Sequence, residues 1–157
     1  MDSNKLENIM KKAKYFSSNK GMKLTPTRKQ VLTTMLRSKK ALSAYELAEQ
    51  VKLEFHRSIP AMSVYRILDV LTDVKLVHKI SSVNRYIACS HITCDHKHMF
   101  ARFLICIRCY KVKELMTQWF TTSAIQENVE ASGFQILNEQ LELNCLCSEC
   151  SDKKIFQ

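Results

Sequence analysis

The 157-residue chain has only two glycines, and its longest strongly apolar run covers five residues. Two glycines are too few for a glycine-rich loop that cradles phosphates, and the chain carries no nucleotide-binding signature. The apolar run, Phe103 to Ile107, is far too short to cross a bilayer. The first ten residues hold no apolar stretch of the kind that a secretory signal needs. We therefore expect a soluble, cytoplasmic protein with no membrane partner.

The excess positive charge of the chain, +9 overall, lies entirely in its first 84 residues. Residues 1–84 contain 16 lysines and arginines against 7 aspartates and glutamates, whereas residues 85–157 contain 8 of each kind. This asymmetry is typical of a polyanion-binding module joined to a second module, although a merely soluble basic face gives the same balance. We expect two small domains, 1–84 and 85–157, each near the lower size limit for a self-sufficient core.

Seven cysteines, an odd number, argue against a disulfide framework in a chain expected in a reducing compartment. Four of them form two Cys-x-x-Cys pairs, Cys106 with Cys109 and Cys147 with Cys150, which are separated by 37 residues. Each pair can bind one side of an ion from a tight turn, so the four thiolates make one complete tetrahedral zinc shell. An unmetallated redox pair is the alternative. Cys145 is expected to be a spare thiol on the opposite face of its strand.

A second group of metal-binding residue types lies before and between these pairs. It consists of His78, Cys89, His91, Cys94, His96, His98 and Glu114. Taken singly, each such residue is more often a structural or surface side chain. Together, beside a complete structural zinc shell, they predict a second site whose ion can exchange, as a metal sensor requires.

The basic segment carries the signals of four helices. Apolar residues at helical spacing predict a helix over residues 5–18. Thr25-Pro26 is a strong helix start, with threonine as N-cap and proline in the first helical position. The stretch Ser43 to Glu46 is a capping box for the next helix, and a further helix opens near Pro60.

Two short strands, 76–80 and 85–88, are expected to follow these helices, joined by the polar turn 81–84. Three helices followed by a small hairpin is the layout of a winged helix, whose third helix enters the major groove of DNA. On that helix, Arg66 can donate two hydrogen bonds to a guanine edge, and Tyr65 can pack on a thymine methyl. A solvated helix charge and a half-buried core tyrosine are the structural alternatives.

Other polar residues of this segment stand where phosphate contacts are favoured. Arg28 and Tyr45 lie at helix starts, and Ser63 lies on the outer surface of the helix that carries Arg66. We expect these residues to contact double-stranded DNA.

Residues 85–157 predict a small α/β domain, which makes the whole chain α+β. The expected elements are strands at 103–107 and 111–115, a helix at 117–132 and a long strand at 134–143. A three-stranded sheet with one helix leaves an edge and an apolar face uncovered, and a second copy of the chain would cover both. We therefore expect a homodimer.

Several motifs, in matching order, resemble the ferric uptake regulator family of bacterial metalloregulators. They are Thr25-Pro26-Thr27-Arg28, Val64 to Asp69, Val77-His78-Lys79 and the two cysteine pairs. Ser43-Ala44-Tyr45 and the spaced residues Ser82, Asn84, Tyr86 and Cys89 are similar to the zinc uptake regulator branch more than to the iron branch. The resemblance implies a dimeric winged-helix repressor that binds operator DNA when its sensor metal is loaded.

The resemblance also implies the ligands of two zinc ions per chain. Those of the structural zinc would be Cys106, Cys109, Cys147 and Cys150, and those of the regulatory zinc His78, Cys89, His98 and Glu114. His96 is the alternative to His98, and Cys94 or His91 could join or replace a ligand. Tyr65 and Arg66 match the family's groove-reading positions. Two imidazoles, one thiolate and one carboxylate suit zinc, whereas an iron(II) sensor normally avoids the softer thiolate.

We therefore predict a zinc-responsive transcriptional repressor of zinc uptake genes, with no enzymatic activity and no small-molecule ligand besides the metal ion. The alternatives are a family member that senses iron, nickel, manganese or peroxide, and a zinc-ribbon adaptor that binds protein only. A zinc deaminase would place His-x-Glu ahead of its cysteine pair, whereas this chain has His96-Lys97-His98. Tyr110 stands where the family usually has glycine, so we expect a distorted turn after Cys109.

Overall fold

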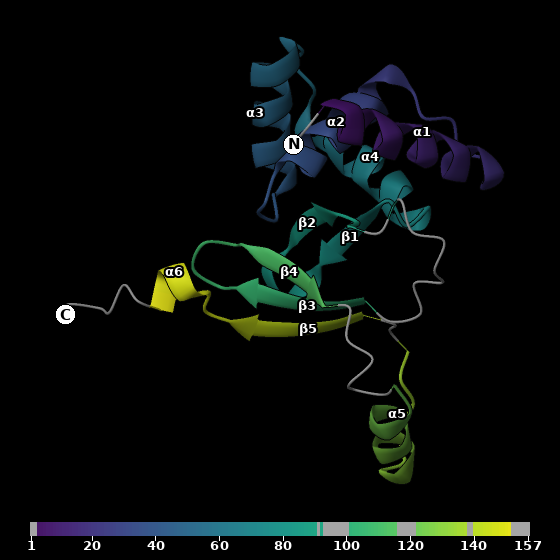
Figure 1. The fold of residues 1–157 in the computed structure, drawn as a ribbon, viewed down its shortest axis with the longest axis vertical. Helices are drawn as coiled ribbons and strands as arrows, with labels where there is room; N and C mark the ends of the chain where they lie inside the picture. The colour runs from purple at the N-terminus through teal and green to yellow at the C-terminus, as the bar shows by residue number, and fades with distance from the viewer. Residues whose placement is uncertain (1–2, 91, 93–100, 116–121, 138–139, 152–157) are drawn as a thin grey trace. The chain divides into compact units, whose positions relative to one another are not determined.

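The structure is a computed structural model, and it describes residues 3–90, 92, 101–115, 122–137 and 140–151. The chain divides into two compact units, an N-terminal unit of residues 1–95 and a C-terminal unit of residues 96–157. Each unit has its own sheet, two-stranded in the first and three-stranded in the second (Figure 1).

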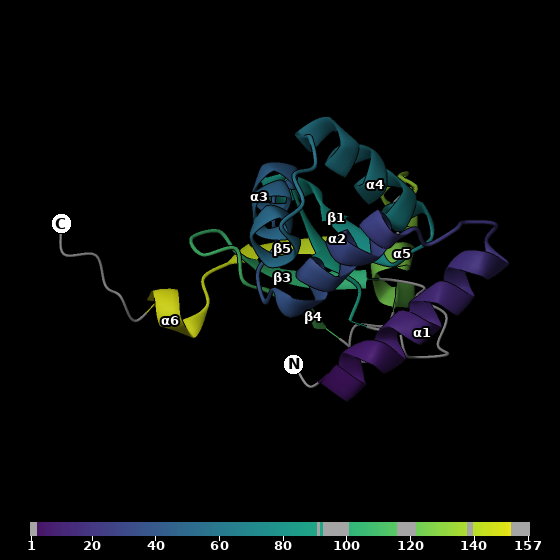
Figure 2. The same cartoon turned by 90° about the horizontal axis from the view of Figure 1, so that it is seen from above.

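Four helices make up most of the N-terminal unit. They are α1 (Ser3–Asn19), α2 (Pro26–Arg37), α3 (Ala44–Phe55) and α4 (Ala61–Asp73). Thr25 caps α2 by accepting a hydrogen bond from the backbone N–H of Arg28, and Ser43 and Glu46 form the predicted capping box of α3. Helix α4 follows Pro60 and has no side-chain cap. Helix α1 lies at the margin of the group, beside α2 (Figure 2).

A small hairpin completes this unit. Strand β1 (Val77–Ile80) pairs antiparallel with β2 (Arg85–Ala88) across the short 3-10 turn η1 (Ser81–Val83). A third stretch joins at Leu42, which accepts a hydrogen bond from the N–H of Tyr86 at 2.8 Å and donates one to its carbonyl oxygen at 2.9 Å. Figure 1 shows the helices gathered on one side of the hairpin, which confirms the predicted winged helix.

Helices and hairpin enclose one core made from the predicted helical stripes. Its fully buried side chains include Val31 and Leu32 of α2, Leu47 and Val51 of α3, and Val64, Leu68 and Leu71 of α4. Burying one such side chain contributes about 1.5–3 kcal/mol, so packing more than intrinsic propensity fixes the position of α4. Within the described ranges, no helix is both long enough and apolar enough to cross a membrane.

The C-terminal unit contains a sheet with the strand order β4–β3–β5 (Figure 1). Its elements are β3 (Ala101–Cys106), β4 (Val112–Leu115), α5 (Thr122–Ala131), β5 (Gln140–Cys145) and α6 (Ser148–Ser151). The central strand β3 pairs antiparallel with β4 and parallel with β5. Phe103 and Ile105 of β3 are buried, whereas Leu141 and Leu143 of β5 stay exposed. One apolar side of β5 is therefore uncovered in the single chain.

The predicted strand over 134–143 is wrong in its first part. Residues 134–137 form no strand, and β5 begins at Gln140. Strands β3 and β5 start side by side, with Ala101 opposite Gln140, so no described part of the sheet offers a partner to the earlier residues. Leu137 is 90% exposed, and high strand propensity has little effect without a pairing neighbour and burial.

The division between the two units falls after Asp95, later than the boundary expected after residue 84. Strand β2 lies beyond residue 84, but it pairs along its whole length with β1. The side chain of Tyr86 belongs to the N-terminal core. The change in charge balance near residue 84 therefore does not coincide with the change in packing, which comes after β2.

Candidate metal centres and DNA-binding surface

The four paired cysteines come together where β3 ends, and all four belong to the C-terminal unit. The sulfur atoms of Cys106, Cys109, Cys147 and Cys150 lie within 4.8 Å of one another. The Sγ atoms of Cys109 and Cys147 are 3.7 Å apart. Zn–S bonds of about 2.3 Å in a tetrahedral shell place neighbouring sulfurs about 3.8 Å apart, so the donor set fits one zinc ion.

Each cysteine pair lies in a tight turn. The N–H of Tyr110 donates to the carbonyl oxygen of Cys106 at 2.9 Å, and the N–H of Cys150 donates to that of Cys147 at 2.9 Å. Tyr110 has a φ of 59°, in the left-handed region that favours glycine. The backbone of the first turn is therefore one that glycine adopts without strain, and the tyrosine is accommodated in it.

Two side-chain contacts hold the turns to each other. Nη1 of Arg108 donates to the carbonyl oxygen of Cys150 at 3.0 Å. Nζ of Lys111 lies 2.5 Å from a carboxylate oxygen of Glu149. Since each contact joins one turn to the other, the protein itself brings the two distant cysteine pairs together.

The pKa values of Cys106, Cys147 and Cys150 are shifted in opposite directions. Burial alone would raise the pKa of Cys106, but hydrogen bonds from three backbone N–H groups of the two turns outweigh it and lower this pKa to about 6. Burial, followed by hydrogen bonding to the other thiols, raises the pKa of Cys150 to about 12, and burial also raises the pKa of Cys147. Repulsion among thiolates is relieved by a bound dication, so this cluster is one that a metal ion would fully ionise.

A second pair of metal-binding side chains lies in the hairpin of the N-terminal unit. His78 stands on β1 opposite Ile87, and Cys89 directly follows β2, with its N–H donating to the carbonyl oxygen of Leu76 at 2.9 Å. Diagonal positions of an antiparallel pair share one face. A ring nitrogen of His78 and the sulfur of Cys89 accordingly lie within 4.8 Å of each other. Both side chains are buried, which makes them a protected half-site for a metal ion.

The other predicted regulatory ligands are not brought into this pair by the N-terminal unit alone. Glu114 belongs to β4 of the C-terminal unit, where it is half-buried and stands opposite Phe103. His98, its alternative His96, and the residues Cys94 and His91 lie outside the described residues.

The predicted base-contacting residues of helix α4 differ in exposure. Arg66 is exposed because the helical period places it opposite the buried stripe, whereas Ser63 and Tyr65 flank the stripe and are half-buried, and Tyr65 packs against the core. The ring of Tyr65 meets that of Tyr45 edge to face, with the centroids 6.3 Å apart and the planes at 84°. Tyr45, at the start of α3, is 68% exposed. The structure thus brings together two predicted DNA-contacting residues from different helices.

Arg28 occupies the first turn of α2, as predicted. Its Nη1 donates to the carbonyl oxygen of Lys23 at 2.6 Å, which fixes the loop before the helix. The guanidinium retains other N–H donors that a phosphate oxygen can accept.

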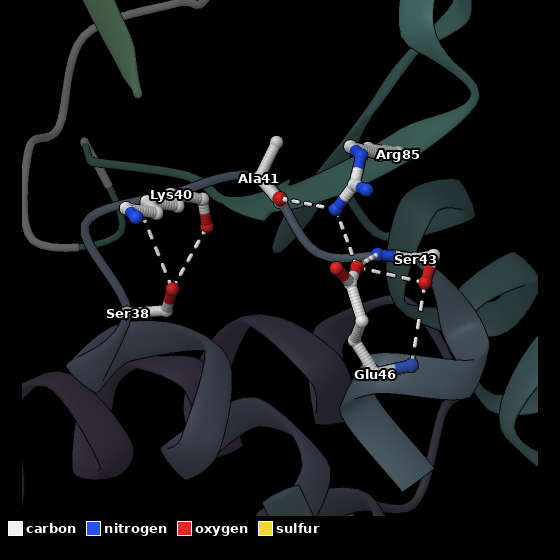
Figure 3. A network of polar contacts seen from close by, with 6 residues as sticks. All are labelled: Ser38, Lys40, Ala41, Ser43, Glu46 and Arg85. Atoms are coloured by element: carbon white, nitrogen blue, oxygen red, sulfur yellow. Dashed lines mark hydrogen bonds and ion pairs between the residues drawn. The ribbon is translucent and has the colours of Figure 1, made fainter. Parts of the chain in front are cut away.

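Arg85 supports the start of α3 (Figure 3), a role that no motif in the sequence indicates. Nη1 of Arg85 donates to the carbonyl oxygen of Ala41 at 3.2 Å and to the carboxylate of Glu46. The same carboxylate oxygen accepts hydrogen bonds from the N–H of Ser43 at 2.7 Å and from its hydroxyl at 2.8 Å. Because Arg85 and Glu46 are 39 positions apart, no local spacing in the sequence indicates their contact.

These contacts lower the pKa of Glu46. Burial by itself would raise the pKa of Glu46, but the hydrogen bonds from Ser43 and the contact with Arg85 hold it below the ordinary value of 4.5. The carboxylate therefore caps α3 and anchors β2 with one charge.

Comparison with known proteins places this architecture in a family. The model of the "Ferric uptake regulator family" matches residues 19–144. The zinc uptake regulation protein of Escherichia coli (strain K12) is 31% identical over 151 residues, which cover 96% of this chain and 85% of that protein. The ferric uptake regulation protein of Bacillus subtilis (strain 168) is 28% identical over 154 residues, covering 95% of this chain and 99% of that protein.

Two solved structures share the fold along most of the chain. A zinc uptake regulator complexed with zinc and DNA gives a TM-score of 0.78 at 27% identity, covering 94% of this chain and 95% of that chain. Holo XcZur gives a TM-score of 0.69 at 34% identity, covering 88% of this chain and 94% of that chain. The chain therefore belongs to the ferric uptake regulator family, within which its sequence and fold resemble those of the zinc uptake regulators.

Proposed function

We infer that the protein is a zinc-responsive, DNA-binding transcriptional repressor that controls zinc uptake genes in the cytoplasm. The observation that carries this inference is the buried His78–Cys89 pair, which lies in the wing hairpin of a DNA-binding fold. A thiolate in that position favours zinc over iron(II). Similarity to the zinc uptake regulation protein of Escherichia coli, and to a zinc uptake regulator complexed with zinc and DNA, supports the same conclusion. A regulator of this family acts by binding and not by catalysis.

One zinc ion is proposed to be structural. Its ligands are Cys106, Cys109, Cys147 and Cys150, whose sulfur spacing and mutual pKa shifts suit a dication. When bound, the ion would neutralise four thiolates and cross-link the turn after β3 to the turn before α6. Such a link is valuable in a unit this small, because its own core supplies little stability.

A second zinc ion is proposed to be regulatory. His78 and Cys89 would hold it together with Glu114 and His98, with His96 as the alternative to His98. The first two ligands belong to the N-terminal unit and Glu114 to the C-terminal unit. An ion that binds all of them would restrain the DNA-binding unit relative to the rest of the chain, so zinc binding and DNA binding would be thermodynamically linked.

The DNA-contacting residues follow from the exposed face of α4 and the neighbouring helix starts. Arg66 would donate two hydrogen bonds to a guanine edge, a contact worth about 1–3 kcal/mol of discrimination between bases. Tyr65 would meet a thymine methyl, while Ser63, Tyr45 and Arg28 would contact the phosphate backbone of the operator duplex.

The repressor is proposed to act as a homodimer. Leu141 and Leu143 lie on the same face of the edge strand β5 and are 41% and 45% exposed in the single chain. Pairing with a second copy would cover them. Two α4 helices held about 34 Å apart, one helical turn of DNA, would then read the two half-sites of an operator.

The second candidate function is a regulator of the same family that responds to iron, nickel, manganese or peroxide. Similarity to the ferric uptake regulation protein of Bacillus subtilis favours this alternative. A zinc-ribbon adaptor that binds protein only is a weaker alternative, because it would not need the outward-facing Arg66.

A metal competition experiment tests the proposal. The probe is a duplex selected from a random-sequence pool by the full-length protein loaded with zinc. We expect zinc to activate binding at free concentrations where iron(II) and manganese do not, and Arg66→Ala to weaken binding while leaving bound zinc unchanged. Activation by iron(II) instead of zinc would favour the second candidate. Failure of the zinc-loaded protein to enrich any duplex would favour the adaptor, and undiminished binding by Arg66→Ala would exclude Arg66 as a base-contacting residue.

A further inference from the structure

Strand β2 contacts α3 and α4, two of the three helices that carry proposed DNA-contacting residues. Arg85 and the backbone of Tyr86 hold the segment from Ala41 to Glu46, which begins α3. The ring of Tyr86 reaches α4, where its centroid lies 6.5 Å from that of Tyr65 with the planes at 71°. One strand of four residues thus supports both α3 and α4.

The three tyrosine rings form a continuous series from the core to the surface. Tyr86 is 3% exposed, Tyr65 is half-buried, and Tyr45 is 68% exposed. Both ring contacts have the edge-to-face geometry in which the positive edge of one ring meets the negative face of another. Nζ of Lys79 lies 6.0 Å from the centroid of the Tyr86 ring, on the neighbouring strand. Tyr86 is therefore the fixed end of the series.

Burial keeps Tyr86 in one chemical state as well as in one place. Burial, and then the nearby Asp69 and Tyr65, raise the pKa of Tyr86 above its ordinary value of 10.0. The ring is thus a neutral packing surface throughout the physiological range. Tyr86 therefore restrains Tyr65 through the packing of its ring and not through a charge.

Tyr65 needs such support because a half-exposed tyrosine on a helix has more than one rotamer available. A side chain that contacts a base edge must be held in one orientation. If it is mobile in the free protein, the entropy lost in ordering it weakens DNA binding. Tyr45 is exposed and cannot supply that restraint alone. The buried ring of Tyr86 can.

We propose that Tyr86 is a positioning residue for operator recognition, which holds the ring of Tyr65 in the orientation that meets the bases without touching DNA itself. This inference rests on the proposed function, since it concerns how the same surface reads its operator. It predicts that loss of the Tyr86 ring affects sequence discrimination more than general affinity for DNA.

A double-mutant cycle tests this inference. The full-length, zinc-loaded protein is measured against the duplex selected from a random pool and against a scrambled duplex of the same length, for Tyr86→Leu, Tyr65→Ala and the double variant. We expect Tyr86→Leu to weaken binding to the selected duplex roughly three- to tenfold, the size of an aromatic pair contact, and to leave binding to the scrambled duplex unchanged. In the Tyr65→Ala background, the same change should have no further effect.

Tyr86→Phe is the matched control and should bind like the wild type, because it keeps the ring. Bound zinc and the thermal midpoint are measured for each variant, and Tyr86→Met replaces Tyr86→Leu if the latter does not fold. Additive losses in the cycle, or equal losses on both duplexes, would overturn the inference while leaving the proposed function intact. If zinc-loaded wild-type protein enriches no duplex from the pool, the proposed function fails and the inference fails with it.

Discussion

Tyr110 adopts a backbone conformation that glycine usually occupies. Its φ of 59° lies in the left-handed region, where a side chain costs about 1–2 kcal/mol. This conformation turns the chain back after Tyr110, so that the carbonyl oxygen of Lys111 accepts a hydrogen bond from the N–H of Cys106 at 2.9 Å. Formation of the cysteine cluster thus keeps a strained residue in place, and the strain can be measured.

We predict that Tyr110→Gly is more stable than Tyr110→Ala by about 1 kcal/mol, because both remove the ring and only glycine relieves the strain. Urea unfolding of the zinc-loaded protein measures the difference. Equal stabilities of the two variants would show that the turn adopts another conformation in solution.

Cys145 and Cys147 lie two residues apart but have different partners. The sulfur of Cys147 belongs to the four-cysteine cluster, whereas the thiol of Cys145 donates to the carbonyl oxygen of Ile105 at 3.4 Å. We predict that Cys147→Ser loses the tightly held zinc on dialysis against a mild chelator, while Cys145→Ser retains it. Metal analysis of the dialysed proteins is the measurement, and zinc loss from Cys145→Ser would contradict the assignment of ligands.

At the scale of residues, the sequence was sufficient to predict the roles of those side chains whose function depends on local spacing. The Cys-x-x-Cys pairs, the Thr25 cap and the outward position of Arg66 each follow from a period or a short motif. The roles of Arg85 and Tyr86 could not be predicted in this way, because their partners are distant in sequence and meet them only after the hairpin packs on the helices.

At the scale of elements, the start of α3 depends on one shared carboxylate. Glu46 has a folded-state pKa below 4.5, so its ionisation stabilises the fold above the unfolded-state pKa and the contribution is lost as pH falls through the folded-state value. Because the Glu46 side chain is 43% exposed in its pair with Arg85, solvent screening limits this contribution to about 1 kcal/mol or less.

We predict that the wild type loses stability below about pH 4.5 more steeply than Glu46→Gln, which keeps the cap but cannot ionise. Urea unfolding between neutral and acid pH gives the two profiles. Glu49→Gln, on the exposed side of the same helix, is the control and should follow the wild type. Parallel profiles for wild type and Glu46→Gln would show that ionisation of Glu46 does not stabilise the fold.

The elements themselves were predicted where a start signal and a buried stripe agree. Helices α2, α3 and α4 meet that condition, and strands β1 and β2 flank the predicted polar turn 81–84. The stretch 134–137 does not, because its apolar residues suggested a strand while no described strand pairs with it. Pairing in a parallel sheet is a long-range event that local propensity does not encode.

At the scale of the whole molecule, the proposed dimer would use the exposed side of β5. Leu143→Lys places a charge among apolar side chains of that face, whereas Asn144→Lys places it on the other face of the same strand. We predict that Leu143→Lys shifts the protein toward monomer and that Asn144→Lys does not. Analytical ultracentrifugation distinguishes the two, and an unchanged dimer for Leu143→Lys would exclude this face as the interface.

The central claim is that an exchangeable zinc ion at His78 and Cys89 controls DNA binding while the four-cysteine zinc stays bound. The most direct measurement is binding to the selected duplex as a function of free zinc, with the bound metal counted at each point. We predict that one zinc per chain survives mild chelation without DNA binding, that binding returns as a second zinc binds, and that His78→Ala keeps the first ion but does not recover binding. Recovery of binding by His78→Ala at the same free zinc concentration would contradict the claim.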